Sequence, residues 1–261
     1  MKKYKAVVFF DLDKTLLNPE KHVYEANIKA VNQLKHNNVL PVISTGKNQY
    51  ELGEIIKESG IQTVIGSNGA DLFIGNRHIY QQPISTEVLE EISFCASNDN
   101  VALAYHSSDG VAVTLNNKYT ESLFTEMHRP IPMKMPNFYR INPVLMLLVF
   151  IPRSSPELEN KYRKKFTSLN FMRNSEVTID TVNQNVSKAY GIRKLLSMAE
   201  LSGAKSFAFG DGNNDISMLK IVDTGIAMGN SVSGLLSVAD YKTDDYRNNG
   251  IPKALSHFKL I

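Results

Sequence analysis

Short apolar runs alternate with amphipathic stretches over the first eighty residues. Residues 5–10 (KAVVFF), 39–45 (VLPVIST) and 62–70 (QTVIGSNGA) contain the β-branched and aromatic residues typical of buried strands. Residues 25–37 have Ile28, Val31 and Leu34 at helical spacing, and residues 48–60 predict a second helix that Gly60 closes. Residues 72–80 predict a hairpin. Buried strands separated by helices indicate a parallel sheet covered on both faces.

The pattern changes between residues 83 and 183, where several prolines interrupt the chain. We expect strands at 101–105, 111–115, 144–151 and 176–180, and helices at 86–97, 118–127 and 156–168. Consecutive strands of this kind indicate an α+β unit.

The alternation then resumes. Residues 187–201 predict a helix with Ser187 near its N-cap, and residues 205–211 and 224–229 predict strands. Helices are expected at 213–222 and 231–239. The sequence therefore predicts an α/β fold, a Rossmann-like, doubly wound parallel sheet formed by residues 1–82 and 184–261. Residues 83–183 are an inserted α+β domain.

The composition is that of an ordinary globular protein, with 43% hydrophobic and 21% charged residues in 261. A net charge of +3 is too small and dispersed to indicate a nucleic-acid or membrane partner. Cys95 is the only cysteine, which excludes an intrachain disulfide. The start of the sequence has too short an apolar run for a signal peptide, and no apolar run approaches the ~20 residues of a membrane span, so we expect a cytoplasmic protein.

Polar residues follow three of the predicted strands. Asp11 and Asp13 follow the first, Thr45 and Gly46 the second, and Asp211 begins the segment after 205–210. Ligands of an open parallel sheet bind outside the carboxyl ends of its strands, so these residues are expected to converge.

Converging carboxylates repel one another unless a cation lies between them. Asp11 and Asp211 offer the oxygen ligands that Mg²⁺ prefers. An EF-hand is excluded because neither acidic loop has Gly at its sixth and Glu at its twelfth position. The histidines lack zinc spacing, and residues 66–70 are too short for a P-loop or dinucleotide fingerprint.

Each candidate also has an ordinary explanation when taken alone. Asp11 and Asp13 could cap a turn, Thr45 could be a strand-end hydroxyl, and Lys188 could be a solvated residue at a helix start. The functional interpretation depends on all of these segments occurring in one order, three of them at strand ends.

That order resembles a known family. DLDKTL, STGK, the lysine of NVSKAYGI and GDGNNDISML are similar to the four motifs of the haloacid dehalogenase-like superfamily. The insert between the second and third motifs resembles the large α/β cap of its Cof-type phosphatases. Lys14 and Lys47 depart from the family's usual Gly and Arg, which puts substrate choice in question more than reaction type.

The resemblance implies a Mg²⁺-dependent phosphomonoester hydrolase that acts through an aspartyl-phosphate on Asp11. Asp13 would be the general acid and base. The implied metal ligands are the Asp11 and Asp211 carboxylates and the Asp13 backbone carbonyl. The implied phosphate ligands are Leu12, Thr45, Gly46, Lys188 and Asn214. Asp215 would support the metal ligands or orient Lys188.

Two other functions stay open at this point. A phosphosugar mutase would use the same intermediate and return the phosphoryl group to a sugar, and a phosphate-binding module would have lost turnover. The expected partner is a small phosphate ester. Sugar phosphates are the family expectation, with pyridoxal phosphate and flavin mononucleotide as further candidates. The sequence does not indicate the substrate or the oligomeric state.

Overall fold

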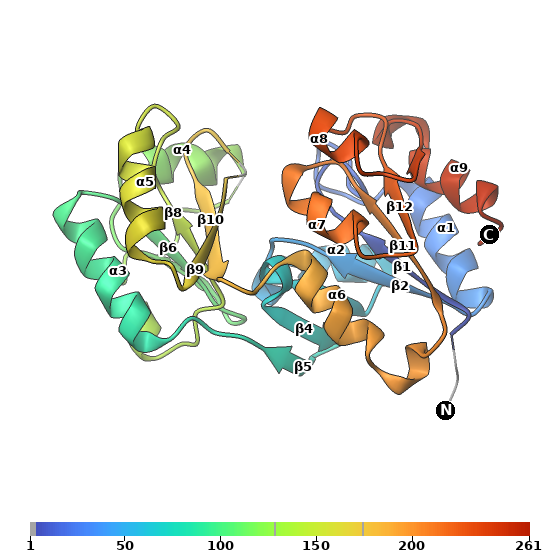
Figure 1. The fold of residues 1–261 in the computed structure, drawn as a ribbon, viewed down its shortest axis with the longest axis horizontal. Helices are drawn as coiled ribbons and strands as arrows, with labels where there is room; N and C mark the ends of the chain where they lie inside the picture. The colour runs from blue at the N-terminus through green and yellow to red at the C-terminus, as the bar shows by residue number, and fades with distance from the viewer. Residues whose placement is uncertain (1–3, 128, 174) are drawn as a thin grey trace. The chain divides into compact units, whose positions relative to one another are not determined.

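The computed structural model describes residues 4–127, 129–173 and 175–261. They form two compact units. The first contains the chain up to Lys47, Glu51–Tyr80 and Ser187–Ile261, and the second contains Asn48–Tyr50 and Gln81–Val186 (Figure 1). The chain thus leaves the first unit near residue 80 and returns near residue 187; the sequence analysis placed these borders at 82 and 184.

Within the described residues, an eight-stranded sheet runs through the first unit in the order β13-β12-β11-β1-β2-β3-β4-β5. The strands from β13 to β3 are parallel, and β4 pairs antiparallel with β3. Their bounds are β1 Ala6–Phe10, β2 Val39–Ser44, β3 Thr63–Gly66, β4 Asp71–Ile74, β5 Arg77–Gln81, β11 Lys205–Gly210, β12 Thr224–Ala227 and β13 Tyr241–Lys242.

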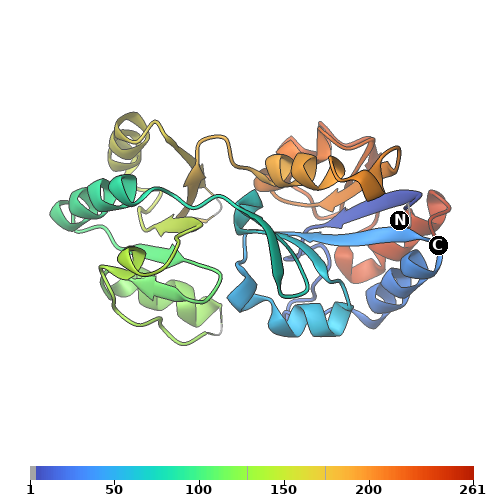
Figure 2. The ribbon, with the colours of Figure 1, turned by 90° about the horizontal axis from the view of Figure 1, so that it is seen from below.

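Both faces of this sheet are covered because the strands are apolar on both sides. In β1, Val8 and Phe10 belong to one core, while Val7 and Phe9 belong to the other. The helices of the first core are α1 Glu25–His36, α2 Gly53–Ser59 and α9 Gly250–His257. Those of the second are α6 Lys188–Leu196, α7 Ile216–Leu219 and α8 Ser233–Leu236. Figure 2 shows the helices on the two sides of the sheet.

The second unit contains an antiparallel sheet in the order β7-β6-β8-β10-β9. Its strands are β6 Leu103–His106, β7 Val111–Val113, β8 Met146–Val149, β9 Leu169–Arg173 and β10 Ile179–Asn183. Helices α3 Thr86–Asn98 and α5 Pro156–Lys165 share a core with one sheet face, and α4 spans Lys118–Glu126. The predicted fold class, a mostly parallel α/β sheet with an inserted α+β part, is confirmed.

Some predicted elements have other bounds. The helix expected at 156–168 ends at Lys165, and the following residues form β9, a strand that was not predicted. The strand expected at 176–180 is Ile179–Asn183. The helices expected at 48–60, 187–201 and 213–222 are each interrupted, with short 3₁₀ turns at Gln49–Glu51, Ala199–Leu201 and Asn213–Asp215. Helix α9 was not predicted either. Further 3₁₀ turns are Ser67–Gly69, Phe138–Arg140 and Tyr246–Asn248.

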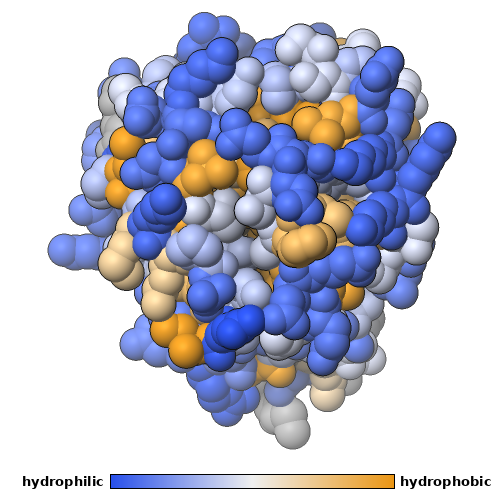
Figure 3. Space-filling view, turned by 90° about the vertical axis from the view of Figure 1, so that its left-hand side faces the viewer, coloured by the Kyte–Doolittle hydropathy of each residue, from blue (hydrophilic) through white to orange (hydrophobic). Residues whose placement is uncertain are grey.

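One face of the surface is mainly polar. Figure 3 shows this face, on which apolar side chains occupy only small, separate areas. Exposed large apolar residues of the second unit include Phe94, Met133 and Ile141. Among the described helices, none combines the length and the apolar character that crossing a membrane requires.

A glycine allows α6 to begin close to the sheet edge. Gly69 lies in the turn between β3 and β4 and has φ +100°. A Cβ atom there would lie 2.0 Å from the carbonyl oxygen of Ser187, which directly precedes α6. The same contact includes Gly191 of α6, whose Cβ would lie 2.4 Å from Ile65. These small residues set the position of the first residue of α6, Lys188.

We therefore expect Gly69→Ala to lower the free energy of unfolding by about 2–4 kcal/mol, because it combines backbone strain with overpacking. Gly53→Ala is the matched control, since open space surrounds Gly53, and it should change stability by less than about 1 kcal/mol. Urea unfolding of both variants measures the difference. Equal midpoints would contradict the close approach of the turn and α6.

Candidate active site

Three neighbouring parallel strands end at one edge of the larger sheet. β1 ends just before Asp11, β2 just before Thr45 and β11 just before Asp211. The last residue of β1 is in register with Ile43 of β2 and Phe209 of β11. The structure therefore brings together the polar residues that follow these strands in the sequence.

Lys188, the first residue of α6, is buried between two carboxylates. Its Nζ donates hydrogen bonds to Oδ1 of Asp11 at 2.5 Å and to Oδ1 of Asp215 at 2.6 Å. Ser187 is the N-cap, as the sequence predicted, and its hydroxyl oxygen accepts the N–H of Tyr190. Burial alone would lower the pKa of Lys188, but Asp11 and Asp215 raise it overall, so the ammonium remains charged. The interpretation of Lys188 as a solvated surface residue is wrong.

Asp215 connects this lysine to the loop after β11. Its Oδ2 accepts the backbone N–H groups of Asp211 and Gly212, each at 3.0 Å. It approaches the strand end because Gly210 has no side chain: a Cβ there would lie 2.6 Å from the Asp215 side chain. Asp215 thus holds both Lys188 and the turn that carries Asp211.

Asp11, Asp211 and Asp215 form an acidic cluster, with one carboxylate oxygen of each within 4.8 Å of the others. Burial, followed by the charge of Asp215, raises the pKa of Asp11 to about 8. The same two causes raise the pKa of Asp211 to about 6, although a hydrogen bond from the Thr15 hydroxyl opposes the shift. If all three carboxylates were ionised, repulsion between their negative charges would destabilise the cluster. A bound cation would relieve this repulsion, so the site favours a cation.

The donor set fits the Mg²⁺ ion that the sequence predicted, because it consists of oxygen atoms only. Both oxygens of Asp215 already accept hydrogen bonds, which leaves Asp11 and Asp211 as the better-placed carboxylate ligands. Thr15, whose hydroxyl donates to Asp211 at 3.0 Å, was not among the predicted site residues. Its position in DLDKT was the available signal.

Asp13 is bound by two lysines. Nζ of Lys47 lies 2.5 Å from its Oδ2, and Nζ of Lys21 lies 2.7 Å from its Oδ1. Burial raises the pKa of Asp13, but Lys47 and then Lys21 outweigh it and lower the pKa to about 2. Sequence reasoning named Lys47 only as a departure from the family pattern and missed Lys21, which lies in the loop before α1.

The turn after β1 is ordered by backbone hydrogen bonds. The Leu12 carbonyl accepts the N–H groups of Thr15, Leu16 and Leu17, and the Leu12 side chain is fully buried. These bonds hold the backbone between Asp11 and Asp13 in one conformation.

Thr45 and Asn214 border the same edge. The Thr45 hydroxyl oxygen accepts the N–H of Lys47 at 3.2 Å, and Gly46 lies between these two residues. The Thr45 carbonyl accepts the N–H of Asn68, whose side-chain oxygen accepts Nδ2 of Asn214 at 3.4 Å. Asn68 is fully buried, and its backbone lies in the left-handed region, with φ 52°. It was quoted from the sequence only as part of NGA, without a role.

Comparison with known proteins agrees with this arrangement. The family described as haloacid dehalogenase-like hydrolase matches residues 8–255. The chain belongs to this family. The resemblance read from the four motifs is thereby confirmed.

Several relatives that match nearly the whole chain are phosphatases by name. The 5-amino-6-(5-phospho-D-ribitylamino)uracil phosphatase YcsE of Bacillus subtilis is 27% identical, over 97% of this chain and 96% of its own. Among solved structures, BT1666 from Bacteroides thetaiotaomicron, a phosphatase of the same superfamily, is 28% identical with a TM-score of 0.89. That match covers 99% of this chain and 96% of BT1666. The sugar phosphatase BT4131 is 26% identical with a TM-score of 0.85, over 98% and 100%. This chain is an enzyme of the phosphatase class, as predicted.

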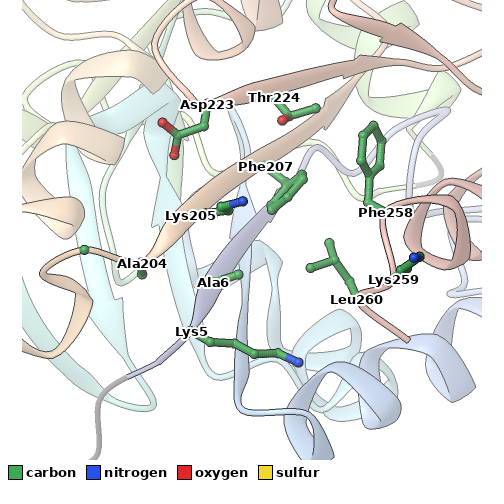
Figure 4. Close-up of a pocket in the computed structure, with 11 residues that line it drawn as sticks. Lys5, Ala6, Ala204, Lys205, Phe207, Asp223, Thr224, Phe258, Lys259 and Leu260 are labelled. Atoms are coloured by element: carbon green, nitrogen blue, oxygen red, sulfur yellow. The ribbon is translucent and has the colours of Figure 1, made fainter.

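A separate cavity of about 700 Å³ lies at the opposite edge of the hydrolase's larger sheet. Its lining includes the first residues of β1, β11 and β12. Figure 4 shows Lys5, Lys205, Phe207 and Phe258 around it. None of its lining residues belongs to the acidic cluster or to the turns beside it. The cavity is therefore distinct from the candidate active site.

Replacing the buried lysine tests the electrostatics of the site. We expect Lys188→Met to lower the free energy of unfolding by about 3 kcal/mol or more, because it leaves Asp11 and Asp215 buried without a cation. Adding Asp215→Asn should restore part of this loss. Lys194→Met, in the same helix but exposed, should cost no more than about 1 kcal/mol. Chemical denaturation in metal-free buffer gives the comparison, and equal stability of the two single variants would contradict the buried ion network.

Proposed function

We propose that the enzyme hydrolyses phosphomonoesters with Mg²⁺, through an aspartyl-phosphate on Asp11. The observation that carries this proposal is the position of Asp11, which directly follows a buried central strand and is bound to the buried Lys188 at 2.5 Å. A nucleophile must approach phosphorus in line with the leaving oxygen, and this anchoring limits its movement. Lys188 holds Oδ1 and thereby fixes the orientation of the Asp11 carboxylate.

The Asp11 and Asp211 carboxylates and the Asp13 carbonyl would hold Mg²⁺. When bound, the ion would offset the repulsion between the carboxylates and the phosphate dianion and polarise a phosphoryl oxygen. Thr15, through its hydrogen bond to Asp211, would orient one of the two carboxylate ligands.

Phosphate oxygens would be held by Lys188, the Thr45 hydroxyl, the Asn214 amide and the backbone near Leu12 and Gly46. These groups are donors at a fixed edge, which stabilises the charge of the transferring phosphoryl group. Asp215 would act through Lys188, because its carboxylate is already engaged by Lys188 and two backbone amides. The Asn68–Asn214 contact would orient the Asn214 amide.

Asp13 would donate a proton to the leaving oxygen and later accept one from the water that cleaves the aspartyl-phosphate. Both of its oxygens are bound to ammonium groups. At least one of these ion pairs must therefore open before Asp13 contacts the leaving oxygen.

We further propose that residues 1–82 and 184–261 are the catalytic core and that residues 83–183 determine which substrate is accepted. A sugar phosphate is the preferred substrate class, supported by the likeness to the sugar phosphatase BT4131 along the whole chain.

Phosphate release from a panel of sugar phosphates tests this function. Release should require Mg²⁺, and Asp11→Asn should reduce it below detection because the nucleophile is lost. Asp13→Asn should reduce it about 10²–10⁴-fold, the usual contribution of general acid–base catalysis. Glu25→Gln, at an exposed acid on α1, is the control and should leave the rate unchanged. Full activity of Asp11→Asn, or equal release without a divalent ion, would contradict the proposal.

A further inference from the structure

Two lysine ammonium groups bind the carboxylate of Asp13, the proposed proton donor to the leaving oxygen. Lys47 binds Oδ2 of Asp13 at 2.5 Å, and Lys21 binds Oδ1 at 2.7 Å. The two lysines come from different segments, the turn after β2 and the loop before α1. Their ammonium groups are thus gathered on one carboxylate beside the proposed reaction centre.

The backbone of Lys21 adopts an unfavourable conformation to reach this position. Its φ is +67°, in the left-handed region where glycine or asparagine is the usual residue. The turn is held by hydrogen bonds from the N–H of Asn18 to the His22 carbonyl at 2.8 Å and from the N–H of Lys21 to the Asn18 carbonyl at 3.0 Å. Neither bond uses the lysine side chain. The ammonium group is therefore what a lysine adds at this position.

The neighbouring acid does not compete for Lys21. Glu58 lies across from the loop, but its Oε1 is bound to His22 Nδ1 at 2.6 Å and its Oε2 accepts the N–H of Val23 at 2.9 Å. These contacts anchor the loop to α2 and leave Asp13 as the acid that Lys21 contacts.

The pair between Lys21 and Asp13 is exchangeable. Its side chains are 50% and 40% exposed, and pairs of this kind contribute little to stability. An anionic ligand could thus replace Asp13 as the partner of Lys21 at little cost. Lys47 is more enclosed, with a side chain 16% exposed, so an anion that reaches it would be bound more strongly.

The distances define where such an anion would lie on the substrate. If one Asp13 oxygen is within hydrogen-bond reach of the leaving oxygen, the ammonium bound to that Asp13 oxygen lies at most about two hydrogen-bond lengths, roughly 5–6 Å, from the leaving oxygen. The other ammonium, bound to the second Asp13 oxygen, lies farther away. A charged group whose central atom is three to five bonds from the ester oxygen can reach the two ammonium groups.

We propose that Lys21 and Lys47 form a second anion-binding subsite, and that the preferred substrates are phosphomonoesters carrying a carboxylate or a second phosphate near the ester oxygen. The proposal rests on the proposed function and makes its substrate class specific. The second anion takes the lysines from Asp13 and so frees its carboxylate to contact the leaving oxygen.

Three substrates with one carbon skeleton test the subsite. Glycerol 3-phosphate has a hydroxymethyl group where 3-phosphoglycerate has a carboxylate and glycerol 1,3-bisphosphate has a second phosphate. We expect kcat/KM to be about tenfold higher or more for at least one of the two substrates that carry a second anionic group, the gain of a charge-assisted hydrogen bond. Comparing the two separates a carboxylate site from a phosphate site.

The variants identify the residue responsible. Lys21→Gly keeps the left-handed turn and removes the ammonium, so the preference for the second anion should fall about tenfold, and Lys21→Arg should retain most of it. Lys29→Met, an exposed lysine paired with Glu25 on α1, is the matched control and should keep the native preference.

Three outcomes would overturn the subsite. They are equal kcat/KM for all three substrates, an unchanged preference in Lys21→Gly, or an equal loss on all three, which would mean that Lys21 serves Asp13 alone. If the native enzyme released phosphate neither from these three substrates nor from any sugar phosphate, the proposed function would fail instead. In that case calorimetric titration tests the subsite independently of turnover. The affinities for 3-phosphoglycerate and for glycerol 3-phosphate are measured with the native protein and with Lys21→Gly, and equal affinities of the native protein for the two compounds would refute the subsite.

Discussion

The buried ion network of Lys188 with Asp11 and Asp215 is the interaction on which the rest of the site depends. Three charged groups in a protein interior are stable only if each is neutralised and hydrogen-bonded. Lys188 meets this condition through two carboxylates from distant segments, and Asp215 adds two backbone amides. The network ties the end of β1, the start of α6 and the loop after β11 to one point. Glycines at positions 69 and 210 make the necessary close approaches possible.

The fold class could be predicted because the apolar pattern of the first unit is simple. KAVVFF and VLPVIS have apolar residues facing both sides, as a strand between two helix layers requires. Element ends were less predictable. β9 (LNFMR) contains two polar residues facing alternate ways and follows a strongly helical stretch, so its strand character appears only through pairing with β10. Helix α9 lacks a side-chain cap at its start, and its apolar face is defined by packing in the first core.

The residues of the candidate site were predictable where a motif or a strand end marked them. Asp11, Thr45 and Asp211 each follow a buried strand, and Lys188 follows a capping serine. The partners of Asp13 were not predictable in the same way. Lys21 reaches it from an irregular loop through a left-handed backbone conformation, and no sequence period specifies such a contact. Asn68 was likewise marked by its motif, but its contact with Asn214 depends on tertiary structure.

The central claim is that Asp11 carries the phosphoryl group during turnover. The most direct measurement is acid quenching of the enzyme with Mg²⁺ and a hydrolysed substrate within the first turnover, followed by peptide mass spectrometry. The account predicts one added phosphoryl group on the peptide that contains Asp11, assigned to Asp11 by fragmentation and lost when turnover is complete. A phosphoryl group found on another residue, or none in an enzyme that is releasing phosphate, would contradict it.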